Sequence, residues 1–216
     1  MSDKQRNLLD LLEHEVQDLY SAENQLIEAL PKMAKAASDS QLKQALKDHL
    51  EETKGQAKRL EQVMKLMDIG PGRTKCKAMA GLVKEGSEWL EEDATKEVKD
   101  AGIIGISQKV EHYEISGYGT ASYYAELLGL AEVQQLLDET LQQEKAADGK
   151  LNDIAKSDVN RKALSDGAAK LSKAGGNGSS GGRSKSSDIG ISGGGKKATS
   201  GGKSASKTSD KSTAKK

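Results

Sequence analysis

The stretch LAEVQQLLDETLQQEKAADGKLNDI, residues 130–154, decides the fold. Core-type residues recur in it at alternating steps of three and four, which is the repeat of a helix with one buried stripe. The stripe consists of Leu130, Val133, Leu137, Thr140, Glu144, Ala147, Leu151 and Ile154. The pattern predicts a long amphipathic helix packed against other helices, with the ionisable Glu144 in the middle of its buried face.

Other segments toward the N-terminus repeat in the same way. We predict a first long helix over about residues 5–37 and a third over about residues 96–128. The second begins after the capping residues Ser38 to Ser40 and ends at the breaker Gly70-Pro71-Gly72. A shorter helix spanning Met79 to Leu90 lies in the connection between the second and third. Two helices, a long crossover and two more helices are typical of a ferritin-like four-helix bundle.

The composition supports an all-α class. Phe is absent, Pro occurs twice, and the chain has one cysteine, Cys76, so an intramolecular disulfide is excluded. A buried structural thiol is a better interpretation of Cys76 than a redox role. No stretch is long and apolar enough to span a membrane, and the N-terminal MSDKQRN lacks the apolar core of a signal peptide. We therefore expect a cytoplasmic protein without membrane contact.

The neutral total charge conceals two regions of opposite charge. Residues 161–216 contain 13 Lys and Arg against 3 Asp, a net of +10, and residues 1–160 contain 20 Lys and Arg against 30 Asp and Glu, a net of −10. The Gly/Ser-rich composition after about residue 174 predicts disorder. We thus expect a helical bundle over 1–160 and a disordered basic tail over 161–216. Without aromatic residues, the tail is expected to contact nucleic acid only weakly and without sequence preference, or to serve as a solubilising segment.

Ionisable residues interrupt the buried stripe near the middle of every long helix. Burying several carboxylates that face one another is costly without a cation between them. Carboxylates and imidazole are ligands that Fe and Mn accept, and bundle cores supply such ligands from facing helices. The candidate ligands are Glu23, His49, Glu52, Glu111, Glu114, Glu144 and Asp148. They predict a site for one or two divalent metal ions.

Some neighbouring residues allow two interpretations. His49 fits a metal ligand nearly as well as a core histidine that is hydrogen-bonded to a carboxylate. His112, adjacent to Glu111, points about 100° away from it around the helix and is expected outside the ligand set. Tyr20 and Tyr118 lie one turn from candidate ligands, where each hydroxyl could bond a ligand carboxylate, although a core tyrosine with a polar partner is the commoner case.

Motifs around these residues resemble the YciF-like ferritin-like proteins of bacteria, a stress-associated group. The motifs are DLYSAENQL around Glu23, ALPKMAKAASDSQLKQAL after it, HLEETKGQ around Glu52, CKAMAGLVKEG in the crossover, QKVEHYEISGYGT around Glu111 and ETLQQEKAADGKL around Glu144. The resemblance covers about residues 8–160. It implies a bundle related to the rubrerythrin and di-iron groups, a homodimer, and a bacterial cytoplasmic location.

The sequence departs from the usual di-iron pattern, in which two helices each carry Glu-x-x-His. The third residue after Glu52 is Gly55, and the third after Glu144 is Ala147. Ferroxidase or peroxidase activity is therefore in doubt, and the identity and number of the metal ions stay open. A set of ligands poor in histidine favours harder ions such as Mn or Mg, or weaker occupancy.

Three functional hypotheses follow. The leading one is a stress-response protein that binds Fe or Mn in the bundle core, with redox chemistry toward oxygen or peroxide left open. The alternative is a metal-free helical scaffold that associates with itself and, through the tail, with anionic partners such as DNA. Iron storage in a shell ranks third, because it requires an assembly that the sequence does not reveal. Whether the chain is an enzyme is undecided.

Overall fold

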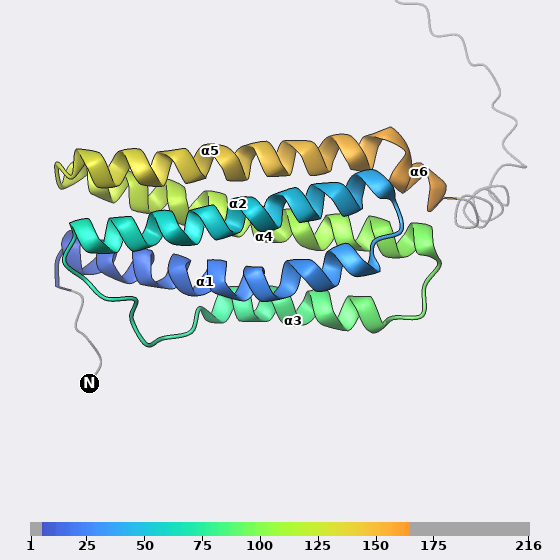
Figure 1. The fold of residues 1–216 in the computed structure, drawn as a ribbon, viewed down its shortest axis with the longest axis horizontal. Helices are drawn as coiled ribbons and strands as arrows, with labels where there is room; N and C mark the ends of the chain where they lie inside the picture. The colour runs from blue at the N-terminus through green and yellow to red at the C-terminus, as the bar shows by residue number, and fades with distance from the viewer. Residues whose placement is uncertain (1–5, 165–216) are drawn as a thin grey trace, which may run out of the picture. The chain divides into compact units, whose positions relative to one another are not determined.

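The structure, a computed structural model, describes residues 6–164. Within that range every regular element is helical (Figure 1). The elements are α1 (Leu8–Ala36), α2 (Ser40–Leu66), α3 (Lys77–Glu91), α4 (Lys96–Leu127), α5 (Ala131–Ile154), a π-helical turn (Ala155–Val159) and the short α6 (Asn160–Lys162). Beyond residue 164 the tail lies outside the described residues, so its disorder and its contact with nucleic acid stay predictions.

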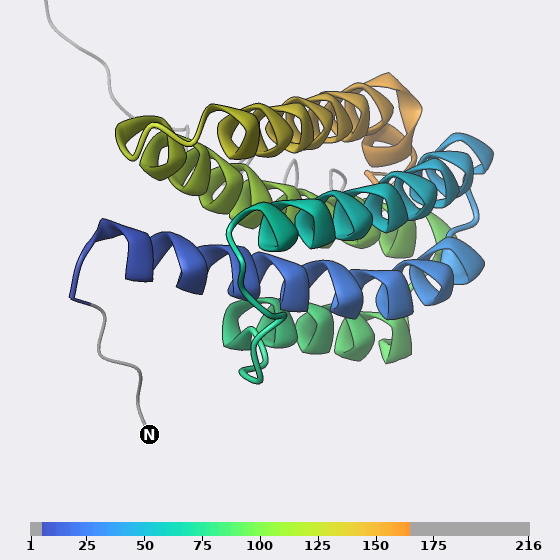
Figure 2. The same cartoon turned by 60° about the vertical axis from the view of Figure 1, so that its left-hand side comes forward.

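The four long helices form two hairpins. Helix α1 packs along α2, helix α4 packs along α5, and the hairpins meet through α2 with α5 and α1 with α4. The crossover between the hairpins contains α3, which lies outside the four-helix core against α1 and α4 (Figure 2). This arrangement confirms the predicted all-α, ferritin-like bundle with a short helix in a long crossover.

Side-chain caps fix the starts of α1, α2 and α4. Asn7 caps α1 by accepting a hydrogen bond from the backbone N–H of Asp10 at 2.9 Å. Asp39 accepts from the first turn of α2, at 2.9 and 3.1 Å, and Thr95 caps α4. Each cap satisfies backbone donors that have no partner within the helix. Thus the Ser38–Ser40 segment starts α2 as predicted.

The end of α2 differs from the prediction. The helix ends at Leu66, before the Gly70-Pro71-Gly72 breaker, because Asp68 adopts a left-handed conformation with φ of 54°. The backbone N–H of Ile69 then bonds the carbonyl of Met64 at 3.0 Å, which closes the helix end. Asp is one of the few residues other than Gly that tolerate this conformation, so the sequence gives only a weak signal there.

A buried carboxylate and a close helix contact hold the α1–α2 turn and the end of α3 against α4. The carboxylate of Asp100 accepts bonds from the backbone N–H groups of Ser38, at 2.8 Å, and Asp39, at 2.9 Å, and also from the Ser38 hydroxyl. Near the start of α4, Gly102 lies directly under the indole of Trp89, where an added Cβ would come within 2.0–2.3 Å of ring atoms. The absence of a side chain at Gly102 therefore lets the end of α3 pack closely on α4.

The apolar core consists of two clusters at opposite ends of the bundle. The first is centred on residues of the α1–α2 turn, α3 and the start of α4, including Leu26, Leu42, Met79, Ile103 and Ile104. The second includes Leu12, Leu19, Leu60, Tyr118 and Leu137. Between the two clusters lies a layer of buried polar side chains, and this layer contains the candidate site.

Candidate metal centre

Four buried side chains from three helices converge in the polar layer. His49 comes from α2, Glu111 and Glu114 come from successive turns of α4, and Glu144 comes from α5. One ligand atom from each residue can be chosen so that all four atoms lie within 4.8 Å of one another. This convergence requires the helical register that the stripes predict, because a rotated helix would turn its carboxylate toward solvent.

Glu23 adds a fourth carboxylate from α1. Its side chain is fully buried, and one of its oxygens accepts a hydrogen bond from the hydroxyl of the buried Tyr118. Burial and the nearby Glu144 carboxylate raise the pKa of Glu23 well above its ordinary value. Although Glu23 is not among the four residues with the closest atoms, it shares their electrostatic environment.

Most ligand-type atoms in this layer have no hydrogen-bond partner from the protein. The unpartnered atoms are Oε2 of Glu23, both ring nitrogens of His49, Oε2 of Glu111, both oxygens of Glu114 and Oε2 of Glu144. Burial raises the pKa of Glu111, Glu114 and Glu144 as well, and neighbouring carboxylates add to the increase for Glu111 and Glu114. Unpaired buried oxygen atoms are costly, and a coordinated cation would satisfy them. The donor set therefore fits a divalent metal ion.

An amide and a guanidinium from α2 hold the outer edge of the cluster. The side-chain amide of Gln56 donates to Glu144, and the guanidinium of Arg59 donates to Thr140 at 2.8 Å and to Gln143 at 3.0 Å. Gln56 lies on the buried stripe of α2, but an amide in a stripe does not reveal which carboxylate it will meet. Sequence reasoning therefore missed its contact with Glu144.

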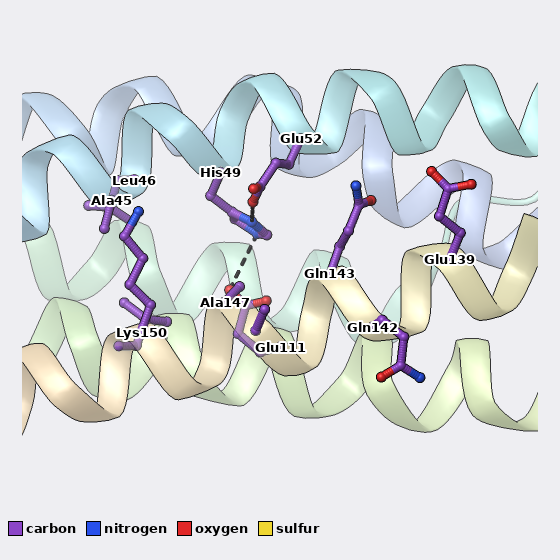
Figure 3. A pocket seen from close by; sticks show the side chains of 12 residues that line it. Ala45, Leu46, His49, Glu52, Glu111, Glu139, Gln142, Gln143, Ala147 and Lys150 are labelled. Atoms are coloured by element: carbon purple, nitrogen blue, oxygen red, sulfur yellow. Dashed lines mark ion pairs between the residues drawn. The ribbon is translucent and has the colours of Figure 1, made fainter.

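The structure separates Glu52 and Asp148 from the buried cluster. The side chain of Glu52 is 48 % exposed, and its Oε2 lies 3.6 Å from Nδ1 of His49, a contact that lowers the pKa of Glu52 (Figure 3). Asp148 is 20 % exposed and faces Nε2 of His112 at 3.4 Å, while His112 itself is largely exposed. Of the seven predicted ligands, five share the buried layer and these two lie at its edge.

The two tyrosines differ in their partners. Tyr118 bonds Glu23 within the layer, whereas the hydroxyl of Tyr20 donates to Glu61 at 3.0 Å, away from the cluster. A third tyrosine, Tyr113, was not predicted to have a role; it donates to Asp18 and lies 3.0 Å from the sulfur of Cys76. Cys76 is buried, as predicted.

Comparisons with known proteins identify relatives over the helical part of the chain. A family model described as a domain of unknown function, DUF892, matches residues 7–164. Protein YciF of Escherichia coli is 47 % identical over 159 residues, which cover 73 % of this chain and 96 % of YciF.

Solved structures agree with this match. The crystal structure of the E. coli stress protein YciF superposes with a TM-score of 0.70 at 46 % identity, covering 72 % of this chain and 99 % of YciF. YcfI from Rhodopseudomonas palustris gives a TM-score of 0.68 at 45 % identity, covering 70 % and 97 %. A protein from Xanthomonas campestris, at 22 % identity, TM-score 0.56 and coverage of 78 % and 99 %, supports the fold alone.

The helices also bear on the prediction that the chain has no membrane-spanning segment. Within residues 6–164, no helix combines the length and the apolar composition needed to cross a membrane.

The matches described above span the whole helical bundle, including the layer of buried carboxylates. The chain therefore belongs to the DUF892 family and is a homologue of the E. coli stress protein YciF.

Proposed function

We propose that the bundle core binds one or two divalent ions, Fe or Mn, and that the protein acts in a stress response through this centre. The observation that supports the proposal is the buried group of His49, Glu111, Glu114 and Glu144, whose ligand atoms lie within 4.8 Å of one another. Several of these atoms have no other partner. The stress role rests on the similarity to E. coli YciF.

The charges in the layer suit two divalent ions. Glu23 and the three clustered glutamates carry four negative charges when ionised, which two divalent cations would neutralise. Imidazole and carboxylate ligands accept both Fe and Mn, and either metal can exchange electrons with oxygen or peroxide. We propose such redox chemistry as the use of the centre.

Protein groups around the layer would orient the ligands. Tyr118 holds one oxygen of Glu23 and Gln56 holds one oxygen of Glu144, which leaves the other oxygen of each free for an ion. Hydrogen bonds of this kind fix the orientation of ligating carboxylates. On the solvent side, Glu52 approaches Nδ1 of His49 and would favour the tautomer with its proton on Nδ1, which leaves the lone pair of Nε2, the nitrogen near Glu111, free for an ion.

Metal content is the decisive test. Full-length protein purified without chelator should contain Fe or Mn at no more than two ions per chain by elemental analysis. Glu144→Gln should lower the occupancy, and the matched control Glu92→Gln, at an exposed position after α3, should leave it unchanged. Equal occupancy in both variants, or wild-type protein that neither retains nor takes up metal, would contradict the proposal.

The alternative is a metal-free scaffold that acts by association. The raised pKa values of the core glutamates favour it, because protonated carboxyls could share hydrogen bonds without a cation. In that case Fe(II) and Mn(II) would leave the melting temperature unchanged.

The homodimer implied by the family resemblance stays a prediction, which sedimentation of the full-length chain would test.

A further inference from the structure

A pocket between α2 and α5 leads from the surface to one side of the carboxylate cluster. Its volume is about 450 Å³, and its lining includes His49 and Glu111 but neither Glu114 nor Glu144 (Figure 3). The pocket therefore reaches the cluster from the His49 side only. An apolar cavity of about 150 Å³ is already large enough for benzene, so this pocket exceeds what an ion or dioxygen needs.

Small side chains keep this space open. Ala45 of α2 and Ala146 and Ala147 of α5 line the pocket, together with the apolar Leu46 and Leu151. Leucine at any of these alanine positions would add a branched side chain to the gap between the helices. The wall is therefore mostly apolar, which suits a hydrocarbon body.

The charges around the pocket disfavour an anionic ligand. Among the lining residues, Glu52, Glu111 and Glu139 are acidic and Lys150 is basic. The ammonium group of Lys150 is already paired with Asp48 at 3.0 Å. Glu139 is likewise paired, with Arg59. An incoming carboxylate or phosphate would thus meet the carboxylates of Glu52 and Glu111 and two cations that already have partners, whereas a neutral molecule would encounter no such repulsion.

The inner end of the pocket offers hydrogen-bonding groups. Both ring nitrogens of the buried His49 and Oε2 of Glu111 have no hydrogen-bond partner. Nε2 of His49 lies 3.3 Å from Oε1 of Glu111, so the two side chains form one polar surface at this end. Because these atoms lie just behind the pocket wall, a rotation of the His49 ring would bring its nitrogen to a ligand with a single oxygen-containing group, whose apolar body would stay among the alanines.

We infer that this pocket binds a neutral, mainly apolar small molecule with one oxygen-containing polar end, the class that comprises organic hydroperoxides and their alcohols, with that end against His49 and Glu111. The inference deepens the proposed function, on which it rests, by naming a substrate class for the metal centre. Binding in the pocket itself involves only side chains of this chain and can be measured without metal.

The probe is 2-phenyl-2-propanol, the alcohol of cumene hydroperoxide, with benzoate as an anionic counterpart of similar size. Saturation-transfer NMR on metal-free, full-length protein should detect the alcohol and give little or no signal for benzoate. Ala147→Leu should weaken binding of the alcohol by about tenfold or more, equivalent to about 1.4 kcal/mol. Ala146→Leu is a second blocking variant at an exposed position, and Ala131→Leu, on the same helix but outside the pocket, should bind as wild type does.

A second measurement places the ligand relative to the centre. In protein loaded with Mn(II), the paramagnetic ion should broaden the proton signals of the alcohol, and Zn(II) should not. Failure of the protein to take up Mn(II), measured by elemental analysis, would contradict the metal centre and leave the metal-free binding result standing. Wild-type protein that gives no signal at millimolar alcohol, equal binding by all variants, or stronger binding of benzoate would overturn the inference.

Discussion

Glu144→Gln should have opposite effects on the metal-free and the metal-loaded protein. Glu144 is fully buried, one of its oxygens accepts from Gln56, and the other has no partner. Glutamine preserves the shape and removes a charge that burial disfavours in the absence of a cation. The metal-free variant should therefore be more stable than metal-free wild type, by roughly 1–3 kcal/mol.

The same substitution should weaken stabilisation by metal. An ion that binds only the folded state raises the free energy of unfolding by about 2.7 kcal/mol at a hundredfold excess over Kd. For a bundle of this size, 1 kcal/mol corresponds to about 2–4 °C in Tm, so wild type should gain roughly 5–10 °C. Glu144→Gln removes one ligand of the cluster and should lose most of this gain, while Glu92→Gln should keep it.

Thermal melts followed by circular dichroism, with chelator and with excess Mn(II), provide the assay. With chelator the variant should have the higher Tm, and with excess Mn(II) this difference should shrink or reverse, because wild type gains more from the ion. The reasoning would be refuted if Glu144→Gln lowered Tm equally with chelator and with Mn(II), because Glu144 would then act as an ordinary structural residue. A Tm shift of the same size in Glu92→Gln as in wild type confirms that the effect belongs to the cluster.

The remaining predictions concern pH and packing. In the folded protein the pKa values of the core glutamates are raised above their ordinary 4.5, so the metal-free folded state binds more protons than the unfolded state. The free energy of unfolding should therefore fall as pH rises above about 4.5. Denaturant titrations across pH, with and without Mn(II), would measure this dependence. Asp100→Ala should cost roughly 1–3 kcal/mol in urea unfolding, since it leaves partly buried donors such as the Ser38 N–H without their acceptor. Gly102→Ala should cost roughly 1–3 kcal/mol and shift the fluorescence of Trp89, whereas Gly105→Ala, with nothing within 4 Å of the added Cβ, should stabilise by roughly 0.5–1 kcal/mol.

The periodic stripes were sufficient to predict the fold. The long helices have the order and nearly the bounds that the sequence predicts, because steps of three and four leave one orientation that buries Leu137 and exposes its polar neighbours. The predicted end of the second helix at Gly70-Pro71-Gly72 was wrong by a few residues: α2 ends at Leu66, and the left-handed Asp68 that ends it is a weak signal beside that breaker.

The site could be predicted only to the level of the helix face. Glu23, Glu111, Glu114 and Glu144 lie in the buried layer because they occupy stripe positions. The location of Glu52 at the rim depends on a rotation of about one residue around α2, which periodicity does not resolve. Contacts between distant segments, such as Gln56 with Glu144, depend on the lengthwise alignment of two helices, about which the repeat within each helix says nothing.

The division of the apolar core into two clusters affects how the molecule unfolds. Each cluster joins segments of several helices at one end, and the layer between them contributes electrostatic repulsion instead of apolar contact. In the metal-free chain, cooperativity between the two ends therefore depends mainly on the continuity of the helix backbones. Amide hydrogen exchange should then show two subglobal opening units, one for each cluster. Coordination of an ion by α2, α4 and α5 at mid-length would link these units and make the bundle open as one.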